Sequence, residues 1–148
     1  MAEYPQKLKE LVELFSILPD RTARIEMLIG CSERYGSVPE EIAARPYPEA
    51  NRIKECESQA YVWGRNQPDG TLKFYVAVEN PQGISAMATA VILDETLSGA
   101  PLEEVAEVPQ EVIYDLFGRE LSMGKSMGLT GILSRIKALA RKRLEETA

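Results

Sequence analysis

Cys31 and Cys56 are the strongest nucleophiles in a sequence of 148 residues that contains no histidine. Without histidine, neither a Ser-His-Asp nor a Cys-His catalytic arrangement can form, and imidazole-based metal sites are excluded. Two cysteines are also too few for a zinc ribbon or an iron–sulfur ligand run. Covalent chemistry in this chain therefore rests on a cysteine that works without histidine, and we expect no metal site.

The two cysteines lie in different sequence settings. Cys31 follows Leu28 by three residues on an apolar helical stripe, so we expect it to pack in the core. Cys56 ends a proline-rich connection and lies just before an expected strand, with polar residues on both sides. A rigid scaffold can present a loop side chain at such a place. Taken alone, Cys56 could equally be a small apolar residue at the start of a strand.

Charged neighbours leave the resting ionisation of Cys56 open. Arg52 and Lys54 would lower the pKa of its thiol, whereas Glu55 and Glu57 would raise it. The order of these residues along the chain does not decide between the two effects.

Hydrophobic spacing predicts helices on both sides of a small sheet. Apolar residues recur at helical intervals in five segments, and Pro39, Pro46 and Pro48 interrupt residues 37–49. Residues 102–105 are predicted to form a turn. The predicted helices cover residues 8–18, 20–36, 84–97, 112–117 and 126–139.

A hairpin is predicted between the second and third of these helices. Residues 58–64 and 72–78 are rich in aromatic and β-branched side chains, and they flank a turn centred on Asp69-Gly70. Residues 51–54 are a candidate third strand, because an isolated hairpin is marginally stable. We therefore predict an α+β fold with a small antiparallel sheet of about three strands flanked by helices, and a single domain over residues 1–148.

The charge and hydropathy of the chain argue against two classes of function, nucleic-acid binding and a role within a membrane. The net charge of −6 argues against nucleic acid as the partner. No apolar stretch reaches the length of a membrane span, and the N-terminus lacks the pattern of a secretory signal. We expect a cytoplasmic protein, or one of an organelle stroma if the chain is a mature imported form.

Two segments resemble the SufE family of sulfur-acceptor proteins. Residues 51–63 (NRIKECESQAYVW) are similar to its active-site segment, where Asn precedes Gly-Cys-x-Ser-x and a hydrophobic strand bearing tryptophan. Residues 121–129 (LSMGKSMGL) match its Leu-(Ser/Thr)-x-x-Arg-Ser-x-Gly-Leu signature. The order of elements also agrees over nearly the whole chain, which implies a SufE/IscU-like fold.

The resemblance implies a function in sulfur transfer. SufE-like proteins bind a SufS-like cysteine desulfurase, which carries pyridoxal phosphate, and accept its sulfur on their own cysteine. They stimulate the desulfurase and deliver sulfur to a downstream iron–sulfur scaffold. By this resemblance, Cys56 is the catalytic acceptor and forms the persulfide, and the chain needs no cofactor of its own. The resemblance implies supporting or partner-binding roles for Asn51, Glu55, Ser58, Gln59 and Lys125.

Family members shelter the acceptor cysteine in an apolar hollow, for which Ile53, Tyr61 and Trp63 are the nearby candidates. The chain departs from the pattern at Glu55, which replaces a glycine, and at Lys125, which replaces an arginine. Two other functions are therefore kept open: a desulfurase-binding regulator that transfers no sulfur, and an IscU-like scaffold, which would need more cysteines. The sequence leaves a monomer and a homodimer as alternatives.

Overall fold

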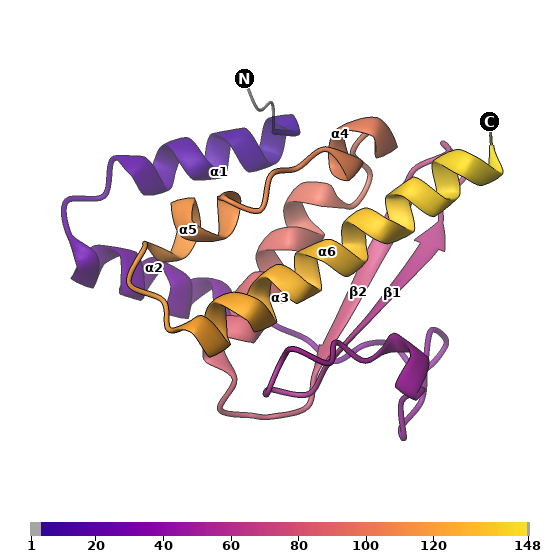
Figure 1. The fold of residues 1–148 in the computed structure, drawn as a ribbon, viewed down its shortest axis with the longest axis horizontal. Helices are drawn as coiled ribbons and strands as arrows, with labels where there is room; N and C mark the ends of the chain where they lie inside the picture. Colours follow the sequence, from indigo (N-terminus) through magenta and orange to yellow (C-terminus); the bar gives the residue numbers. More distant parts are fainter. Residues whose placement is uncertain (1–3, 148) are drawn as a thin grey trace.

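The computed structural model describes residues 4–147 and has an α+β fold of six helices and a two-stranded antiparallel sheet (Figure 1). The helices are α1 (Gln6–Ser16), α2 (Arg21–Glu33), α3 (Ile84–Leu97), α4 (Leu102–Ala106), α5 (Val112–Phe117) and α6 (Met123–Glu146). The strands are β1 (Ala60–Asn66) and β2 (Leu72–Val78), and a 3₁₀ turn covers Glu49–Asn51. The predicted fold class is confirmed.

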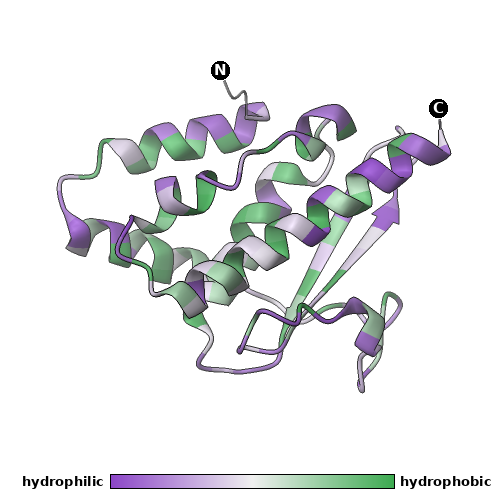
Figure 2. Ribbon diagram, in the orientation of Figure 1, coloured by the Kyte–Doolittle hydropathy of each residue, from purple (hydrophilic) through white to green (hydrophobic). Residues whose placement is uncertain are grey.

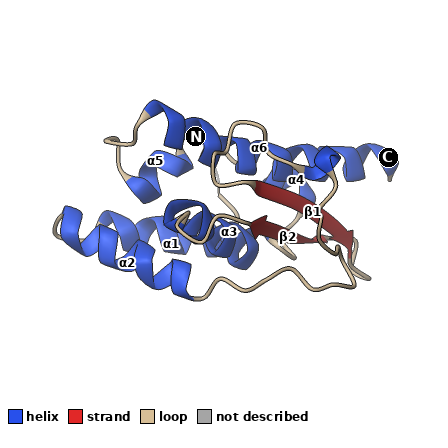
Figure 3. Ribbon diagram, turned by 90° about the horizontal axis from the view of Figure 1, so that it is seen from below, coloured by secondary structure: helices blue, strands red, loops and turns tan. Residues whose placement is uncertain are grey.

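The hairpin lies at one end of the molecule, and α1, α2 and α5 gather at the other (Figures 1 and 3). Helices α3 and α6 join the two ends, because α3 packs on β2 and α6 packs on β1. Helix α6 crosses in front of α3 on its way to the hairpin (Figure 1). The start of α6 is thereby held close to the loop that precedes β1.

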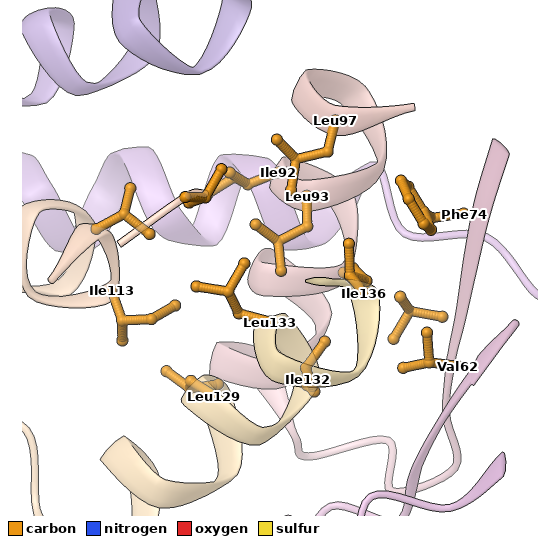
Figure 4. Packing of buried hydrophobic residues seen from close by; sticks show 14 of the residues in the cluster. Val62, Phe74, Ile92, Leu93, Leu97, Ile113, Leu129, Ile132, Leu133 and Ile136 are labelled. Carbon is orange, nitrogen blue, oxygen red and sulfur yellow. The ribbon is translucent and has the colours of Figure 1, made fainter. Parts of the chain in front are cut away.

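The core forms between one face of the hairpin and these two helices (Figure 4). Val62 pairs with Val76 across the ladder, and both side chains are buried on the same face, as strand periodicity requires. Helix α3 is apolar on nearly every side, which fits its central position (Figure 2). Ile132, Leu133 and Ile136 of α6 are fully buried against it. Cys31 is buried at 3% exposure, as expected.

The predicted third strand is wrong. Arg52 forms one isolated bridge with Tyr61, and the chain leaves the sheet directly afterwards. The cause is a tight turn, in which the Cys56 backbone N–H donates to the Ile53 carbonyl. The chain between η1 (Glu49–Asn51) and β1 is therefore used to form a loop rather than to extend the sheet.

Several element boundaries and one element type also differ from prediction. Helix α6 begins at Met123, because the Ser122 hydroxyl caps the Lys125 N–H, while Ser126 instead bonds the Tyr114 hydroxyl. Residues 102–106 form a helix where a turn was predicted. Strand β1 starts at Ala60 rather than at residue 58, since the two preceding residues belong to the loop. No helix within residues 4–147 is both long and apolar enough to cross a membrane.

Candidate functional site

Cys56 lies on a loop that is closed at its base by backbone hydrogen bonds. The Ile53 N–H donates to the Ala60 carbonyl over 2.8 Å, and the Gln59 N–H donates to the Cys56 carbonyl over 3.3 Å. Gln59 completes the reversal with φ +57°, a left-handed conformation that is uncommon outside glycine. The loop thus has a defined shape, and we call residues 53–60 the Cys56 loop.

A second set of contacts ties this loop to the connection between β2 and α3. The Asn80 N–H donates to the Ser58 carbonyl and the Glu79 N–H to the Gln59 carbonyl, each over 3.1 Å. A Cβ atom at Gly83 would lie 2.6 Å from the Ser58 hydroxyl oxygen, so only glycine fits there without a shift. Gly83, which the sequence marks as a turn residue, is therefore a packing requirement of the site.

Two glycines of α6 let the Cys56 loop lie directly on the helix. A Cβ at Gly128 would be 3.2 Å from the Cys56 Cα, and a Cβ at Gly131 would be 2.8 Å from Ile53 Cγ2. Real Cβ atoms essentially never make contacts as short as 2.8 Å, and a contact of 3.2 Å is tighter than nine in ten of theirs. The two glycines, one turn apart, thus form a flat seat for the loop.

Arg135, one turn further along α6, fixes the entrance to the loop. Its guanidinium donates to the Ala50 carbonyl over 3.0 Å and to the Arg52 carbonyl over 3.3 Å. The Asn51 side-chain amide donates to the Val62 carbonyl of β1 over 2.9 Å. Arg135 makes the contacts with backbone carbonyls that the sequence suggested for Lys125.

The thiol of Cys56 is almost fully enclosed, with 5% of the residue exposed. It borders a cavity of about 280 Å³ between the loop, the start of α3 and the start of α6. Ser58, Ile84 and Lys125 line the same cavity. The structure therefore brings together Cys56 and two of the five residues that were predicted to support it, Ser58 and Lys125.

Burial raises the pKa of the Cys56 thiol. Hydrogen bonding from Ser58 and from the Ala60 backbone lowers it in part, and the charge of Glu57 raises it further. The resting side chain is therefore a thiol at neutral pH. Arg52, which was expected to oppose this, forms an ion pair with Glu49 over 3.0 Å.

This pKa predicts how alkylation of Cys56 depends on pH. Because the thiolate is the reactive form, iodoacetamide should label Cys56 slowly at neutral pH, and the rate should still be rising above the ordinary thiol pKa. The folded state retains the thiol proton, so this group stabilises the fold below the unfolded-state pKa, and the contribution is lost as the pH rises through the folded-state pKa. Peptide mapping separates Cys56 from Cys31, and a rate that levels off near neutral pH would contradict the assignment.

The remaining predicted site residues do not line the Cys56 cavity. The Glu55 carboxylate lies against Gly131 and faces a different hollow, which is bordered by Thr130 and Arg135. Gln59 contributes its backbone to the loop, as described above, and Asn51 holds the chain to β1. These three positions shape the loop rather than touching the thiol.

The predicted apolar shelter is partly wrong. Ile53 is buried beneath the loop, as expected. Tyr61 and Trp63 instead stack on each other on the other face of the hairpin, with ring centroids 6.2 Å apart. The Tyr47 ring packs against both at steep angles, with centroids 5.2 and 5.1 Å away. Because strand residues alternate in direction, residues 61 and 63 point away from the core, and the shelter comes from α3 and α6. The described residues hold no group of three or more His, Cys, Asp or Glu side chains placed to bind a metal ion.

Replacement of Arg135 tests whether this side chain holds the loop. Arg135→Met should lower the free energy of unfolding by about 1–2 kcal/mol, because two carbonyls lose their donor, and should raise the alkylation rate of Cys56. Arg141→Met is the matched control, since Arg141 donates to the Ala106 carbonyl from the same helix. It should cost similar stability without changing Cys56 alkylation, and equal alkylation in both variants would contradict the role of Arg135.

An α+β fold that holds one enclosed cysteine on a loop between a helix seat and a hairpin is the arrangement expected of a sulfur-acceptor protein. The model of the Fe-S metabolism associated domain, SufE, matches residues 9–140. The chain therefore belongs to the SufE family and is a protein of iron–sulfur metabolism.

Two relatives support this assignment. The chain is 25% identical over 142 residues to "SufE-like protein 1, chloroplastic/mitochondrial" of Arabidopsis thaliana, and the match covers 96% of this chain. It spans 36% of the length of that curated relative. The solution structure of a hypothetical protein from Thermus thermophilus matches with a TM-score of 0.76 and 28% identity, over 97% of this chain and 99% of that one.

Proposed function

We propose that Cys56 accepts one sulfur atom from a SufS-like cysteine desulfurase and carries it as a persulfide to a downstream iron–sulfur scaffold. The observation that carries the proposal is the seating of Cys56 on Gly128 of α6, at the edge of a cavity that Ser58 and Lys125 also line, in a chain of the SufE family. In this proposal residues 1–148 act as one sulfur-acceptor domain.

The transfer step is a displacement at sulfur. The Cys56 thiolate attacks the outer sulfur of the donor enzyme's cysteine persulfide, so a new bond joins Cys56 Sγ to that sulfur. The bond between the donor's two sulfurs breaks, and its electron pair leaves on the donor thiolate. The proton of the Cys56 thiol passes to water or to a base of the donor enzyme. The step is neutral in redox terms and needs no cofactor on this chain.

The enclosure of Cys56 determines when this step takes place. At 5% exposure the sulfur is out of reach of a second protein, and the thiol form is a poor nucleophile. The Cys56 loop therefore has to leave its seat when the desulfurase docks, which exposes the thiol and removes the cause of its raised pKa. Between transfers, the same enclosure keeps oxidants from the persulfide.

Stimulation of the desulfurase tests this proposal. With cysteine as substrate, the cognate desulfurase leaves alanine when sulfur is removed. Adding this chain should raise the rate of alanine formation and should saturate as the complex forms. An unchanged rate, together with measurable binding of the two proteins, would contradict the acceptor role of Cys56.

A further inference from the structure

A second hollow adjoins the Cys56 cavity and has a different character. This groove has a volume of about 670 Å³ and lies between α2, the start of α3 and the connection from α5 to α6. We propose that the groove binds an acidic, amphipathic helical segment of the sulfur-donating partner, an inference that rests on the proposed function and deepens it.

The floor of the groove is apolar and half-exposed. Ile25 and Ile29 lie one turn apart on α2, and they are 43% and 44% exposed. Ile84, at the start of α3, is 44% exposed and lies on the same surface. Leu28, which is also on α2, is buried at 8% exposure, whereas the two isoleucines of α2 are left half-exposed by the described residues. An apolar helix face of a partner would cover this floor.

The rim of the groove is positively charged in an acidic protein. Four cations line it against a single carboxylate, Glu120, which gives a net +3 in a chain whose total is −6, so the remainder of the chain carries −9. Complementary charge favours an acidic occupant and selects against a basic one. The cations are Arg21, Arg24, Arg119 and Lys125.

The rim is also held in place by the fold. Arg24 donates to the Asp115 and Leu116 carbonyls over 2.8 and 2.9 Å, which ties α2 to α5. Arg21 forms an ion pair with Glu120 over 2.8 Å. Because Arg24 is already held by its two hydrogen bonds, binding of an occupant costs little of the side-chain entropy of Arg24.

The groove is continuous with the Cys56 cavity. Ile84, Ser85 and Lys125 line both hollows. A helix in the groove therefore ends beside the start of α6, on which the Cys56 loop is seated. Docking there places the donor next to the loop that has to open.

Paired substitutions test the groove apart from the sulfur chemistry. Arg21→Glu reverses one rim charge and Ile29→Ser removes part of the floor. Both residues are outside the core, and neither lines the Cys56 cavity. The matched controls are Arg65→Glu, on the exposed end of β1, and Ile17→Ser, at 76% exposure beyond α1. Binding to the cognate desulfurase is measured by calorimetry at two salt concentrations, and sulfur uptake is measured with glutathione persulfide as a small donor.

Arg21→Glu and Ile29→Ser should each weaken desulfurase binding about tenfold, and the loss for Arg21→Glu should shrink at high salt. The two controls should bind like the wild type, and uptake from glutathione persulfide should be unchanged in all four variants. Groove variants that bind like the controls would overturn the proposal. A homodimer of the wild-type chain that dissociates on these substitutions would also overturn the proposal, because a second copy of the chain would then occupy the groove. If wild-type Cys56 takes sulfur neither from the desulfurase nor from glutathione persulfide, the proposed function is wrong. The binding data still test whether the groove binds the desulfurase.

Discussion

Cys56→Ser should abolish both sulfur uptake and stimulation of the desulfurase while leaving the two proteins able to bind. The hydroxyl of serine is not ionised at neutral pH and is a far weaker nucleophile toward sulfur than a thiolate. The substitution is nearly isosteric, and the loop keeps its backbone hydrogen bonds and its contact with Gly128. The measurement is the rate of alanine formation with and without the variant, alongside its affinity for the desulfurase.

Cys31→Ser is the control for this result. Cys31 is 3% exposed, lies on α2 and is absent from the lining of the Cys56 cavity. Its replacement should leave uptake and stimulation near wild-type levels, although a buried hydroxyl costs some stability. Full stimulation by Cys56→Ser would instead favour the non-transferring regulator, to which the thiol is irrelevant.

The second large effect is expected at the seat of the loop. Gly128→Val should displace the Cys56 loop, because even the first side-chain carbon would lie 3.2 Å from the Cys56 Cα and valine adds two more methyl groups. Overpacking of this kind costs about 1–3 kcal/mol of folding free energy. Because the thiol then leaves its enclosure, its alkylation at neutral pH should become at least about tenfold faster, as its pKa returns toward the ordinary value.

Gly124→Val separates this steric effect from the general effect of replacing a helical glycine. Gly124 lies one turn earlier on α6, and no other atom lies within 4 Å of a Cβ built there. The control should therefore leave Cys56 alkylation unchanged and should alter stability by less than about 1 kcal/mol through helix propensity. Equal alkylation rates in the two variants would show that Gly128 does not seat the loop.

The sequence was sufficient for the parts of the fold that depend on local pattern. The hairpin, the central helix α3 and the apolar face of α6 each follow from periodicity within one segment, and the structure has all three. The third strand was predicted from residues 51–54 without regard to the turn at Cys56, and backbone hydrogen bonding within that turn prevails. The predicted start of the last helix at residue 126 is wrong, because Ser122 caps the helix and the Ser126 hydroxyl bonds that of Tyr114, twelve residues away in a different helix.

The machinery around Cys56 was harder to predict, because it is formed by long-range contacts. Arg135 reaches carbonyls more than eighty residues earlier in the chain, and no local pattern distinguishes it from the other basic residues of the last helix. Gly128 and Gly131 did carry a signal. Two glycines one turn apart inside a helical pattern weaken the helix, so they indicate a close approach by another segment. The identity of that segment required the structure.

Mass spectrometry of the intact protein tests the central claim most directly. After incubation with the cognate desulfurase and cysteine, followed by rapid removal of the desulfurase, the wild-type chain should gain the mass of one sulfur atom. A reductant should remove the added mass, and fragmentation should locate it on Cys56. A chain that stimulates the desulfurase yet gains no sulfur, or gains it equally after Cys56→Ser, would contradict the assignment of Cys56 as the acceptor.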